Sequence, residues 1–365
     1  MNEPVRLRFK SFYTKYERWI PIAAFVCGFL FDMALLHRID EPKVILQQAI
    51  YLVISCVLIT LDFFEQVHEI QPPVFLRKIW KYREFLLHFL LGTLLNSYTI
   101  FYFKSASGIT SFLFIFILVA ALTLAEFKRF GESQHRVHMG LWSLCLISYF
   151  QSLLPILVGA IGMLIFVASG LVSILVFYMY YRFMRSRLAS RPDILKTEIL
   201  YPYAATHALF ALLYFSHAIP PVPLSVSYMG IYHSAEKKDG QYLLTYTRPW
   251  YKFWQHGDET FYARPNDQVL AFMQVFMPSR FKEQLQIRWS LLDPKHGWQL
   301  QDAIPLTLTG GREEGYRAVI TKKNYQPGRW RVQIECLDNR EVGRLSFTII
   351  ADDSADAREE HVDVR

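Results

Sequence analysis

Residues 139–181 read MGLWSLCLISYFQSLLPILVGAIGMLIFVASGLVSILVFYMYY and contain no Lys, Arg, Asp or Glu. A helix that crosses a bilayer needs about 20 consecutive apolar residues, so the run is long enough for two such helices. Pro155, Gly159 and Gly162 are the residues of the run that favour a turn. The run therefore predicts two consecutive membrane-spanning helices joined by a tight turn near these residues.

The composition of the whole chain agrees with this prediction. Of its 365 residues, 52% are hydrophobic and 19% are charged, whereas soluble domains contain about 25% charged residues. The same search for long apolar runs predicts seven spans in all. They cover residues 19–37, 44–64, 85–103, 109–127, 139–157, 160–181 and 200–219.

The net charge of +7 arises entirely within residues 1–219, because residues 220–365 contain equal numbers of basic and acidic residues. Most basic residues of the apolar part lie in the N-terminal tail and in the connectors after even-numbered spans. The other connectors hold Arg38, Lys43 and Lys104. Because basic connectors stay in the cytoplasm, we expect a multi-pass membrane protein with a cytoplasmic N-terminus and a C-terminal domain outside. In a bacterium this is an inner-membrane protein with a periplasmic C-terminal domain. Basic residues distributed in this way do not indicate a nucleic-acid partner.

The C-terminal part alternates between apolar and polar residues, as half-buried strands do. The clearest strand is WRVQIEC at 330–336, and its predicted hairpin partner is 345–349, across Asp338 and Asn339. Cys336 falls on the apolar side of this strand, which predicts a buried thiol. Further strands are predicted at 224–233, 241–247, 268–277, 285–292, 303–309 and 315–322. Short strands at this spacing predict an all-β, immunoglobulin-like sandwich.

These patterns divide the chain into four parts. Residues 1–18 form a basic cytoplasmic tail, 19–219 a transmembrane domain of about seven α-helices, 220–351 a periplasmic β-sandwich domain and 352–365 an acidic tail that we expect to be disordered. The boundary before the sandwich is rich in proline, with Pro220, Pro221 and Pro223.

The segment from about 285 to 350 resembles a known family. The residues that carry the resemblance are Trp289, Gly310–Arg317, Lys322, Pro327–Val332, Gly343 and Phe347. They resemble the C-terminal module catalogued as Domain of Unknown Function 2914. The resemblance implies a bacterial, envelope-associated protein whose role is not established, and it implies neither catalytic residues nor anything specific about the helical part.

The β-domain contains two groups of candidate ligand-binding residues. Arg312 and Arg317 lie close enough in sequence to bind a phosphate or carboxylate together; the alternative is that the glycine-rich segment around them is a turn, with Glu313 and Glu314 as internal partners. Trp250 and Trp254 belong to an aromatic run that also contains basic residues. The run comprises Tyr246, Trp250, Tyr251, Phe253, Trp254, Phe261 and Tyr262, with Arg248, Lys252 and His256. Its rings are expected to rest on the bilayer surface, to pack in the core or to stack on a glycan.

Polar residues at membrane depth are the candidates for catalysis, because their burial in lipid is costly. Asp32 lies within the first span. A denser set lies at the cytoplasmic ends of the second and third spans and comprises Asp62, Glu65, His68, Glu84 and His88. Glu65 and His68 have the spacing of a di-iron ligand pair, but no second such pair exists, so neither a metal nor another cofactor is expected. The alternative is hydrogen bonding between helices.

Two hypotheses of function follow. In the first, which we favour, the helices are a platform without enzymatic activity and the β-sandwich binds an envelope component: a protein, a glycan or a lipid headgroup. In the second, the spans form an intramembrane lipid- or glycan-modifying enzyme or a carrier that uses their acidic and histidine residues. The expected partners are the lipid bilayer and a periplasmic protein or glycan. No pattern indicates the ligand or the oligomeric state.

Overall fold

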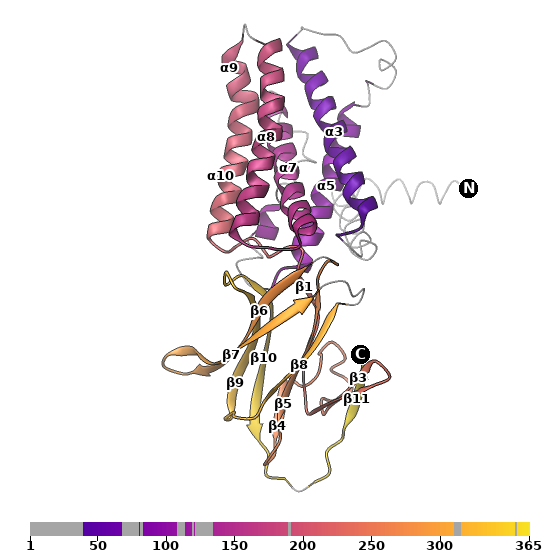
Figure 1. Cartoon of the computed structure of the whole chain (residues 1–365), viewed down its shortest axis with the longest axis vertical. Helices are drawn as coiled ribbons and strands as arrows, with labels where there is room; N and C mark the ends of the chain where they lie inside the picture. The colour runs from indigo at the N-terminus through magenta and orange to yellow at the C-terminus, as the bar shows by residue number, and fades with distance from the viewer. Residues whose placement is uncertain are drawn as a thin grey trace, which may run out of the picture.

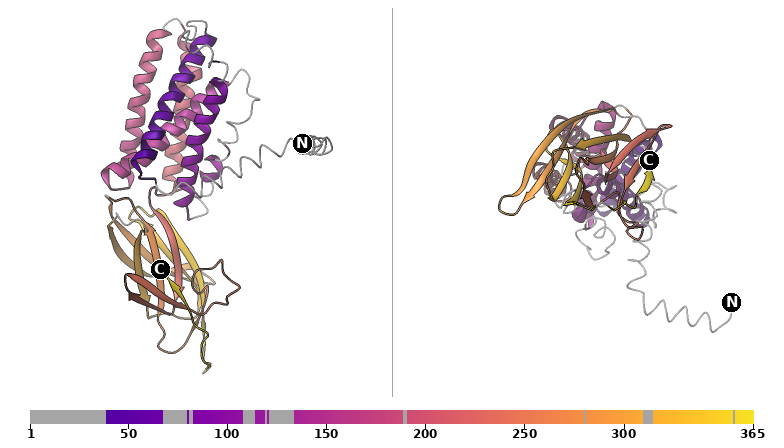
Figure 2. Two further views of the ribbon diagram at one scale, coloured as in Figure 1. Left: turned by 90° about the vertical axis from the view of Figure 1, so that its right-hand side faces the viewer. Right: turned by 90° about the horizontal axis from the view of Figure 1, so that it is seen from below.

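The computed structural model describes residues 39–67, 80, 83–107, 114–118, 120, 134–188, 191–279, 281–309, 315–354 and 356–365. A helical part and an all-β part lie end to end along the long axis of the molecule (Figure 1). A perpendicular view shows the same arrangement (Figure 2). The chain passes from helices to strands near the three prolines that the sequence marks as a boundary.

The helical part is a bundle of long helices. They are α3 (Pro42–Gln66), α5 (Arg83–Lys104), α7 (Gln134–Val158) and α8 (Met163–Arg187), followed by α9 (Pro192–Leu195), a π-helical turn η2 (Lys196–Leu200) and α10 (Tyr201–Phe215). Within the described residues, the first four are long and apolar enough to cross a membrane. They coincide with the second, third, fifth and sixth predicted spans.

Seven spans are not supported. The first predicted span, at 19–37, lies outside the described residues, and the fourth, at 109–127, is described at only a few positions. The seventh, at 200–219, differs from α10, which has 15 residues. This helix continues backwards through η2 into a charged segment and ends before His217, whose φ is 56°, so its apolar length is shorter than the prediction.

The turn between α7 and α8 is shorter than expected. Pro155 lies inside α7 instead of in the turn, and Gly159 and Gly162 make the turn with φ values of 77° and 123°. A proline removes a hydrogen bond from a helix and clashes with its preceding turn, and α7 ends at Val158, three residues after Pro155. The glycines end α7 because they accept positive φ without a clash of Cβ.

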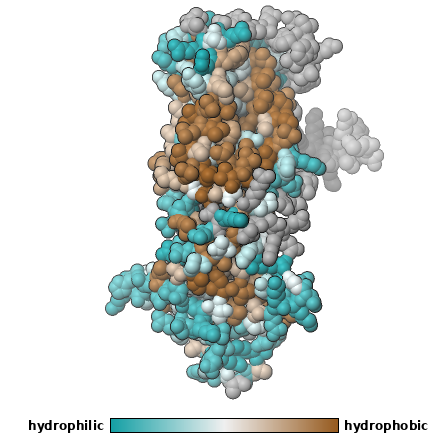
Figure 3. Space-filling view, viewed as in Figure 1, coloured by the Kyte–Doolittle hydropathy of each residue, from teal (hydrophilic) through white to brown (hydrophobic). Residues whose placement is uncertain are grey.

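The polarity of the longest helices is the reverse of that in a soluble protein. Helix α8 buries Ser169 and Ser173 together with Phe177 and Met184, whereas Leu164 is 81% exposed and Leu171 is 60% exposed. Helix α3 likewise buries Gln48, Ser55 and Thr60 among its apolar residues. Figure 3 shows a hydrophobic belt across the visible face of the helical part, with hydrophilic residues at its far end and over much of the β part. A helix in water would expose its polar face instead.

The β part is built from three antiparallel or mixed sheets. Its strands are β1 (Ser225–Tyr232), β2 (Ser234–Lys238), β3 (Gln241–Tyr246), β4 (Thr260–Ala263), β5 (Val269–Phe276), β6 (Lys282–Asp293), β7 (Gly297–Thr309), β8 (Tyr316–Lys322), β9 (Gly328–Cys336), β10 (Glu341–Ala351) and β11 (His361–Val364). The sheet orders are β1-β5-β8, β4-β10-β9-β6-β7 and β11-β3-β2. The first two sheets share one hydrophobic core, which makes the arrangement sandwich-like.

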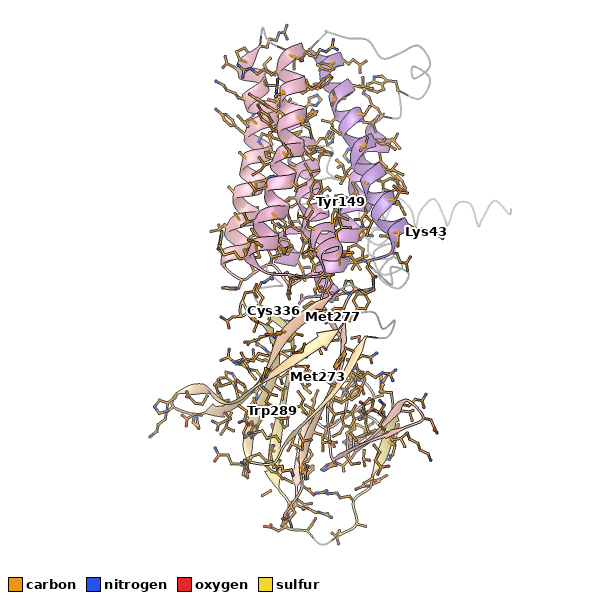
Figure 4. All side chains as sticks on the ribbon, viewed as in Figure 1. Lys43, Tyr149, Met273, Met277, Trp289 and Cys336 are labelled. Carbon is orange, nitrogen blue, oxygen red and sulfur yellow. The ribbon has the colours of Figure 1, made fainter. Side chains whose placement is uncertain are left out.

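The predicted hairpin is confirmed. Strands β9 and β10 pair antiparallel, with Trp330 opposite Phe347, and Asn339 in the turn has a φ of 62°. Trp289 and Trp330 are fully buried, and Cys336 is a buried free thiol. Figure 4 shows Cys336 and Met277 at the end of this part nearest the helices, and Trp289 farther away.

The sequence missed three short strands, β2, β4 and β11. Strand β2 (SAEKK) has Ala235 as its one apolar residue, and β4 and β11 have four residues each, so none has enough alternation to predict a strand. These strands form through pairing with distant segments: β4 pairs parallel with β10, and β11 pairs antiparallel with β3.

The prediction of a disordered tail at 352–365 was wrong. Besides the pairing of β11, Arg264 forms a salt bridge to Asp352 at 2.7 Å. Arg358 forms another to Asp267. The composition of the tail is that of a disordered segment, but its charges are neutralised by residues of opposite sign that the fold places beside it.

The two parts are in direct contact. The Ser107 hydroxyl after α5 donates to Glu341 of β10 at 2.8 Å. The Arg340 guanidinium lies 5.1 Å from the centre of the Tyr214 ring of α10. Ile161, in the α7–α8 turn, packs against the β core, and Phe276 packs against the helical core. The β-domain is therefore docked on the helix ends, a contact that the sequence did not reveal.

Candidate functional site

Several of the predicted catalytic residues meet at the end of the bundle remote from the β part. The Arg83 Nε donates to Asp62 Oδ1 at 2.7 Å, and the Trp80 indole N–H donates to Glu65 Oε2 at 2.6 Å. His135 Nε2 of α7 lies 3.5 Å from Asp62 Oδ2. The structure thus brings together Asp62 and Glu65, which the sequence grouped. Both carboxylates already have partners, as expected for a link between helix ends.

Of the other predicted catalytic residues, the structure describes only the side chain of His88. The His88 ring contacts His138 edge to face, with ring centres 5.4 Å apart. Asp32, His68 and the side chain of Glu84 lie outside the described residues. Among the described residues, no three metal-binding side chains come together. The cluster therefore has the composition of an ionic link between α3, α5 and α7.

A second polar cluster lies inside the bundle, centred on His207 of α10. Ser173 of α8 lies 2.9 Å from its Nε2, and Ser143 of α7 lies 3.4 Å from its Nδ1. The Tyr203 carbonyl oxygen is 3.2 Å from Nδ1. The imidazole thus hydrogen-bonds to residues of three helices, which is the inter-helix role that polar residues often have in membrane proteins.

The aromatic run separates into buried and exposed parts. Phe261 is fully buried in β4, whereas residues 247–258, which we call the aromatic loop, project rings into solvent. Trp250 is 83% exposed, Phe253 is 79% exposed and Trp254 is 63% exposed. Core packing is therefore excluded for these rings. Neighbouring rings are nearly perpendicular, at 83° for the pair Trp250–Tyr251 and 80° for the pair Phe253–Trp254.

The base of the aromatic loop is held rigidly. The buried Asp258 carboxylate accepts the Thr247 amide N–H through both oxygens at 3.0 Å, so it closes the loop end to end. Gly257 forms an isolated bridge with Ile231 of β1. The His256 ring lies on Tyr228, with ring centres 4.3 Å apart. The exposed rings thus extend from a fixed base.

A buried charged network supports this base. The His233 ring stacks on the Phe261 ring, with ring centres 4.1 Å apart. The Nε2 atom of His233 lies 3.5 Å from Asp258 Oδ2. Burial, aided by the Arg358 guanidinium, lowers the pKa of His233 to about 4. Burial raises the pKa of Asp258 to about 6, although the hydrogen bonds from Thr247 oppose this shift. Both residues are therefore expected to be neutral between these two pH values.

The two shifts have opposite effects on stability. An unfolded histidine has a pKa of about 6.5, so below this pH the unfolded chain binds a proton that buried His233 does not, and stability falls down to about pH 4. Asp258 binds its proton in the folded state from about pH 6 downwards, so its contribution to stability rises as the pH falls. In the wild type the two effects partly cancel.

The variant Asp258→Asn is expected to lose stability more steeply on acidification than the wild type. It lacks the stabilising protonation of Asp258 in the folded state but keeps the loss that arises because His233 is protonated only in the unfolded chain. The extra loss between pH 7 and pH 4.5 is therefore about 2 kcal/mol. Urea unfolding at both pH values measures it. The exposed Asp239→Asn is the control, and parallel pH dependences of Asp258→Asn and the wild type would contradict the prediction.

The predicted arginine pair is only half described. Arg312 lies outside the described residues. Arg317 of β8 pairs with Gln274 in the sheet, and its Nη1 donates to the Gly240 carbonyl oxygen at 3.2 Å. Arg317 thus links β8 to the turn between β2 and β3. The site formed by Arg312 and Arg317 together stays a prediction.

Residues 282–349 match a known family, described as Protein of unknown function (DUF2914). The match confirms the resemblance of the C-terminal segment, and it covers β6 to most of β10. Among proteins of curated function, none matches this chain.

Similarities to solved structures are weak. An immunoglobulin-like protein from Pseudomonas aeruginosa has 10% identity and a TM-score of 0.22, with 35% of this chain and 98% of that chain covered. A β-glucosidase of saponin metabolism from intestinal bacteria has 14% identity and a TM-score of 0.22, with coverages of 35% and 16%. A β-glucosidase from Listeria innocua has 13% identity and a TM-score of 0.20, with coverages of 32% and 16%. This chain thus spans 16% of the length of these β-glucosidases, and similarities of this size support no conclusion about it.

Proposed function

We propose that this protein is an integral membrane protein whose helices anchor an immunoglobulin-like β-domain at the membrane surface. The reversed polarity of the helices supports the membrane placement. Residues such as Leu164 and Leu171 face outward while Ser169 and Ser173 face inward, and this arrangement is stable in lipid but costly in water. The belt in Figure 3 has the same distribution.

The distribution of basic residues supports a periplasmic β-domain. Helix α8 ends in Arg185 and Arg187, at the end of the bundle opposite the β part (Figure 1). Helix α5 begins with Arg83 at that same end. Because basic residues flank the cytoplasmic side of membrane helices, the opposite end, where the β-domain is docked, is assigned to the periplasm of a bacterium.

We further propose that the β-domain binds an envelope component through the aromatic loop, and the exposure of its rings is the observation that carries this proposal. Four large aromatic side chains in one loop are more than half exposed, although water disfavours such surfaces. The base of the loop contacts Tyr228, on which the Arg365 guanidinium lies. The C-terminus lies on the β part (Figure 1), so the base of the loop belongs to the β-domain while its rings stay exposed.

A glycan is the component that the chemistry of the loop favours. Each exposed ring offers one face to a sugar, and Lys252 lies among the rings in the sequence as a donor to hydroxyl and carboxylate groups. Arg248 instead faces Asp363, and Gln255 donates to Glu259. The perpendicular neighbours do not form a continuous flat platform. We therefore expect separate sugar units to bind separate rings, principally Trp250 and Trp254.

Co-sedimentation of the detergent-solubilised protein with purified cell-wall sacculi tests this function. We expect the wild type to bind and Trp250→Ala or Trp254→Ala to weaken binding at least ~10-fold each, as truncation of an aromatic anchor does. Leu337→Ala, at an apolar residue exposed elsewhere on the β-domain, is the matched control. Absence of wild-type binding, or equal binding by all variants, would contradict glycan recognition and direct the search to a protein partner.

The second candidate function is chemistry at the helix-end cluster. The convergence of Asp62, Glu65 and His135 favours it, whereas the partners that already bind both carboxylates oppose it. Asp62→Asn and Glu65→Gln with matched expression separate the two functions. If both variants retain the phenotype of the wild type, the cluster is a link between helices.

A further inference from the structure

Two arginines of β9 lie on the outer face of the five-stranded sheet. The side chains of Trp330 and Val332 point from this strand into the core. Because successive side chains of a strand point to opposite faces, Arg329 and Arg331 point outward, from positions about 7 Å apart along β9. Arg329 is exposed and Arg331 is half-buried. We call these two residues the arginine pair.

The carboxylates around the arginine pair are already neutralised by other arginines. Glu335 of β9 binds Arg288 of β6, with 2.9 Å between Oε2 and Nη1. Glu341 of β10 binds Arg344 of the same strand, with 2.5 Å between Oε2 and Nη2. In the described part of the chain, no hydrogen bond or ion pair engages the side chains of the arginine pair. Their two positive charges are therefore left over after these acids are paired.

An aromatic ring, instead of a carboxylate, holds Arg331. Its guanidinium carbon Cζ lies 4.4 Å from the centre of the Trp298 ring of β7. Its Nε atom is buried and has no hydrogen-bond partner among the described residues. Burial and then repulsion from Arg344 lower the pKa of Arg331, although Glu341 and Glu335 oppose this shift. A guanidinium stacked on a ring keeps the N–H groups at its edge available for an oxyanion.

Hydroxyl groups border the arginine pair on the two neighbouring strands. Ser346 of β10 and Ser290 of β6 lie opposite Arg331, and Thr348 of β10 lies opposite Arg329. Side chains directly opposite each other in antiparallel strands share one face of the sheet. This face can therefore bind negatively charged groups and hydroxyl groups side by side, and an acidic sugar carries both.

The arginine pair lies away from the helices. Cys336, the last residue of β9, lies at the end of the β part nearest the helices (Figure 4). Arg331 precedes it by five residues, which is about 17 Å along a strand, whereas the headgroup layer of a bilayer is about 5–8 Å thick. With the proposed membrane placement, the headgroups of a bilayer around the helices do not reach the pair. An anion outside the bilayer is favoured.

We propose that the arginine pair binds an acidic polysaccharide, with a carboxylate or phosphate group of the polymer at each guanidinium. An acidic peptide is disfavoured, because β9 lies between β10 and β6 and offers no free edge to which a peptide could add as a strand. The inference extends the proposed binding of an envelope component. It rests on the membrane placement for the exclusion of lipid headgroups, and it does not rest on the aromatic loop.

Titration of fluorescently labelled polysaccharides with the full chain in a mild detergent tests the proposal. The probes are polygalacturonate, which carries carboxylates, phosphorylated dextran, which carries phosphates, and neutral dextran. We expect one or both acidic polymers to bind at least ~10-fold more tightly than neutral dextran, and to bind more weakly as salt is added. The tighter of the two identifies the anionic group. The double variant Arg329→Gln, Arg331→Gln is expected to lose the preference.

Lys238→Gln combined with Lys323→Gln is the charge-matched control, at exposed residues outside the five-stranded sheet. Arg329→Glu protects the test against misfolding, because it reverses one charge at an exposed residue and is expected to abolish the preference with the fold intact. Equal binding of neutral dextran, an unchanged preference in both arginine variants, or an equal loss in the lysine control would overturn the proposal. Tighter binding of polyglutamate than of either acidic polysaccharide would overturn it in favour of an acidic protein.

The failure of this proposal and the failure of the aromatic loop as a glycan site are distinguishable. Trp250→Ala is expected to leave the binding of the acidic polysaccharides unchanged, and a loss equal to that of the double variant would overturn the arginine pair as a separate site. Sacculus binding that depends on Trp250 and Trp254, without a preference for acidic polysaccharides, refutes the arginine pair alone. The converse result supports the arginine pair and refutes the aromatic loop.

Discussion

Replacement of Gly257 by alanine is expected to displace the aromatic loop and to lower the free energy of unfolding of the β-domain by about 3 kcal/mol. Gly257 has a φ of 65°, and an added Cβ would lie 2.1 Å from the Ile231 carbonyl oxygen and 2.8 Å from its amide nitrogen. Both neighbours are backbone atoms of β1, so they cannot move aside as a flexible side chain does. The bridge between the loop and β1 must open.

Gly240→Ala is the matched control for this variant. Gly240 also has a positive φ, of 81°, but an added Cβ there would meet nothing within 4 Å. It therefore carries the backbone strain, about 1 kcal/mol, without the collision. Urea unfolding in mild detergent measures stability, and co-sedimentation with sacculi measures binding. Equal effects of the two substitutions on both quantities would show that the contact with Ile231 does not hold the loop.

Truncation of Trp330 to alanine is expected to destabilise the β-domain by about 3–5 kcal/mol. The side chain is 1% exposed, and it lies in β9, the strand between β10 and β6 in the five-stranded sheet. Its indole N–H donates to the Gln326 carbonyl oxygen at 2.8 Å. The substitution therefore leaves a large cavity and an unsatisfied carbonyl oxygen, and urea unfolding is expected to show a lower midpoint.

Substitution of phenylalanine at two tryptophans separates the cavity from the hydrogen bond. Trp330→Phe loses volume and the hydrogen bond, whereas Trp289→Phe loses volume alone, because the Trp289 indole N–H has no partner among the described residues. We expect Trp330→Phe to be the more destabilising by about 1 kcal/mol. Equal losses would show that the bond to Gln326 contributes nothing to stability.

Much of the fold was predictable because the spacing of hydrophobic residues shows which face of a helix or strand is buried. The alternation at 330–336 predicted β9, and the matching alternation at 345–349 predicted its partner β10. Four of the predicted spans coincide with long helices because an apolar run of that length has few other stable structures. The family resemblance at about 285–350, which the match at 282–349 confirms, also depended on local residues such as Trp289.

The candidate sites were predictable only as residue types. The sequence grouped Asp62 with Glu65, since both lie within one helical turn, but Arg83 and His135 reach them from other helices. It did not decide whether Trp250 and Trp254 pack in the core, rest on the membrane surface or bind a glycan, because tryptophan occurs in all three environments. The exposed fraction of each ring depends on what the rest of the chain covers.

The sequence by itself determined an apolar helical part, a separate β-domain and the strands with strong alternation, because each of these follows from the chemistry of consecutive residues. Only the tertiary structure decided that Ser169 and Ser173 face inward, that the acidic tail joins β3 as a strand, and that the β-domain docks on the helix ends. These features depend on contacts between residues far apart in the chain. The free energy that stabilises these features comes from pairs of residues distant in sequence, and a local sequence pattern cannot reveal such pairs.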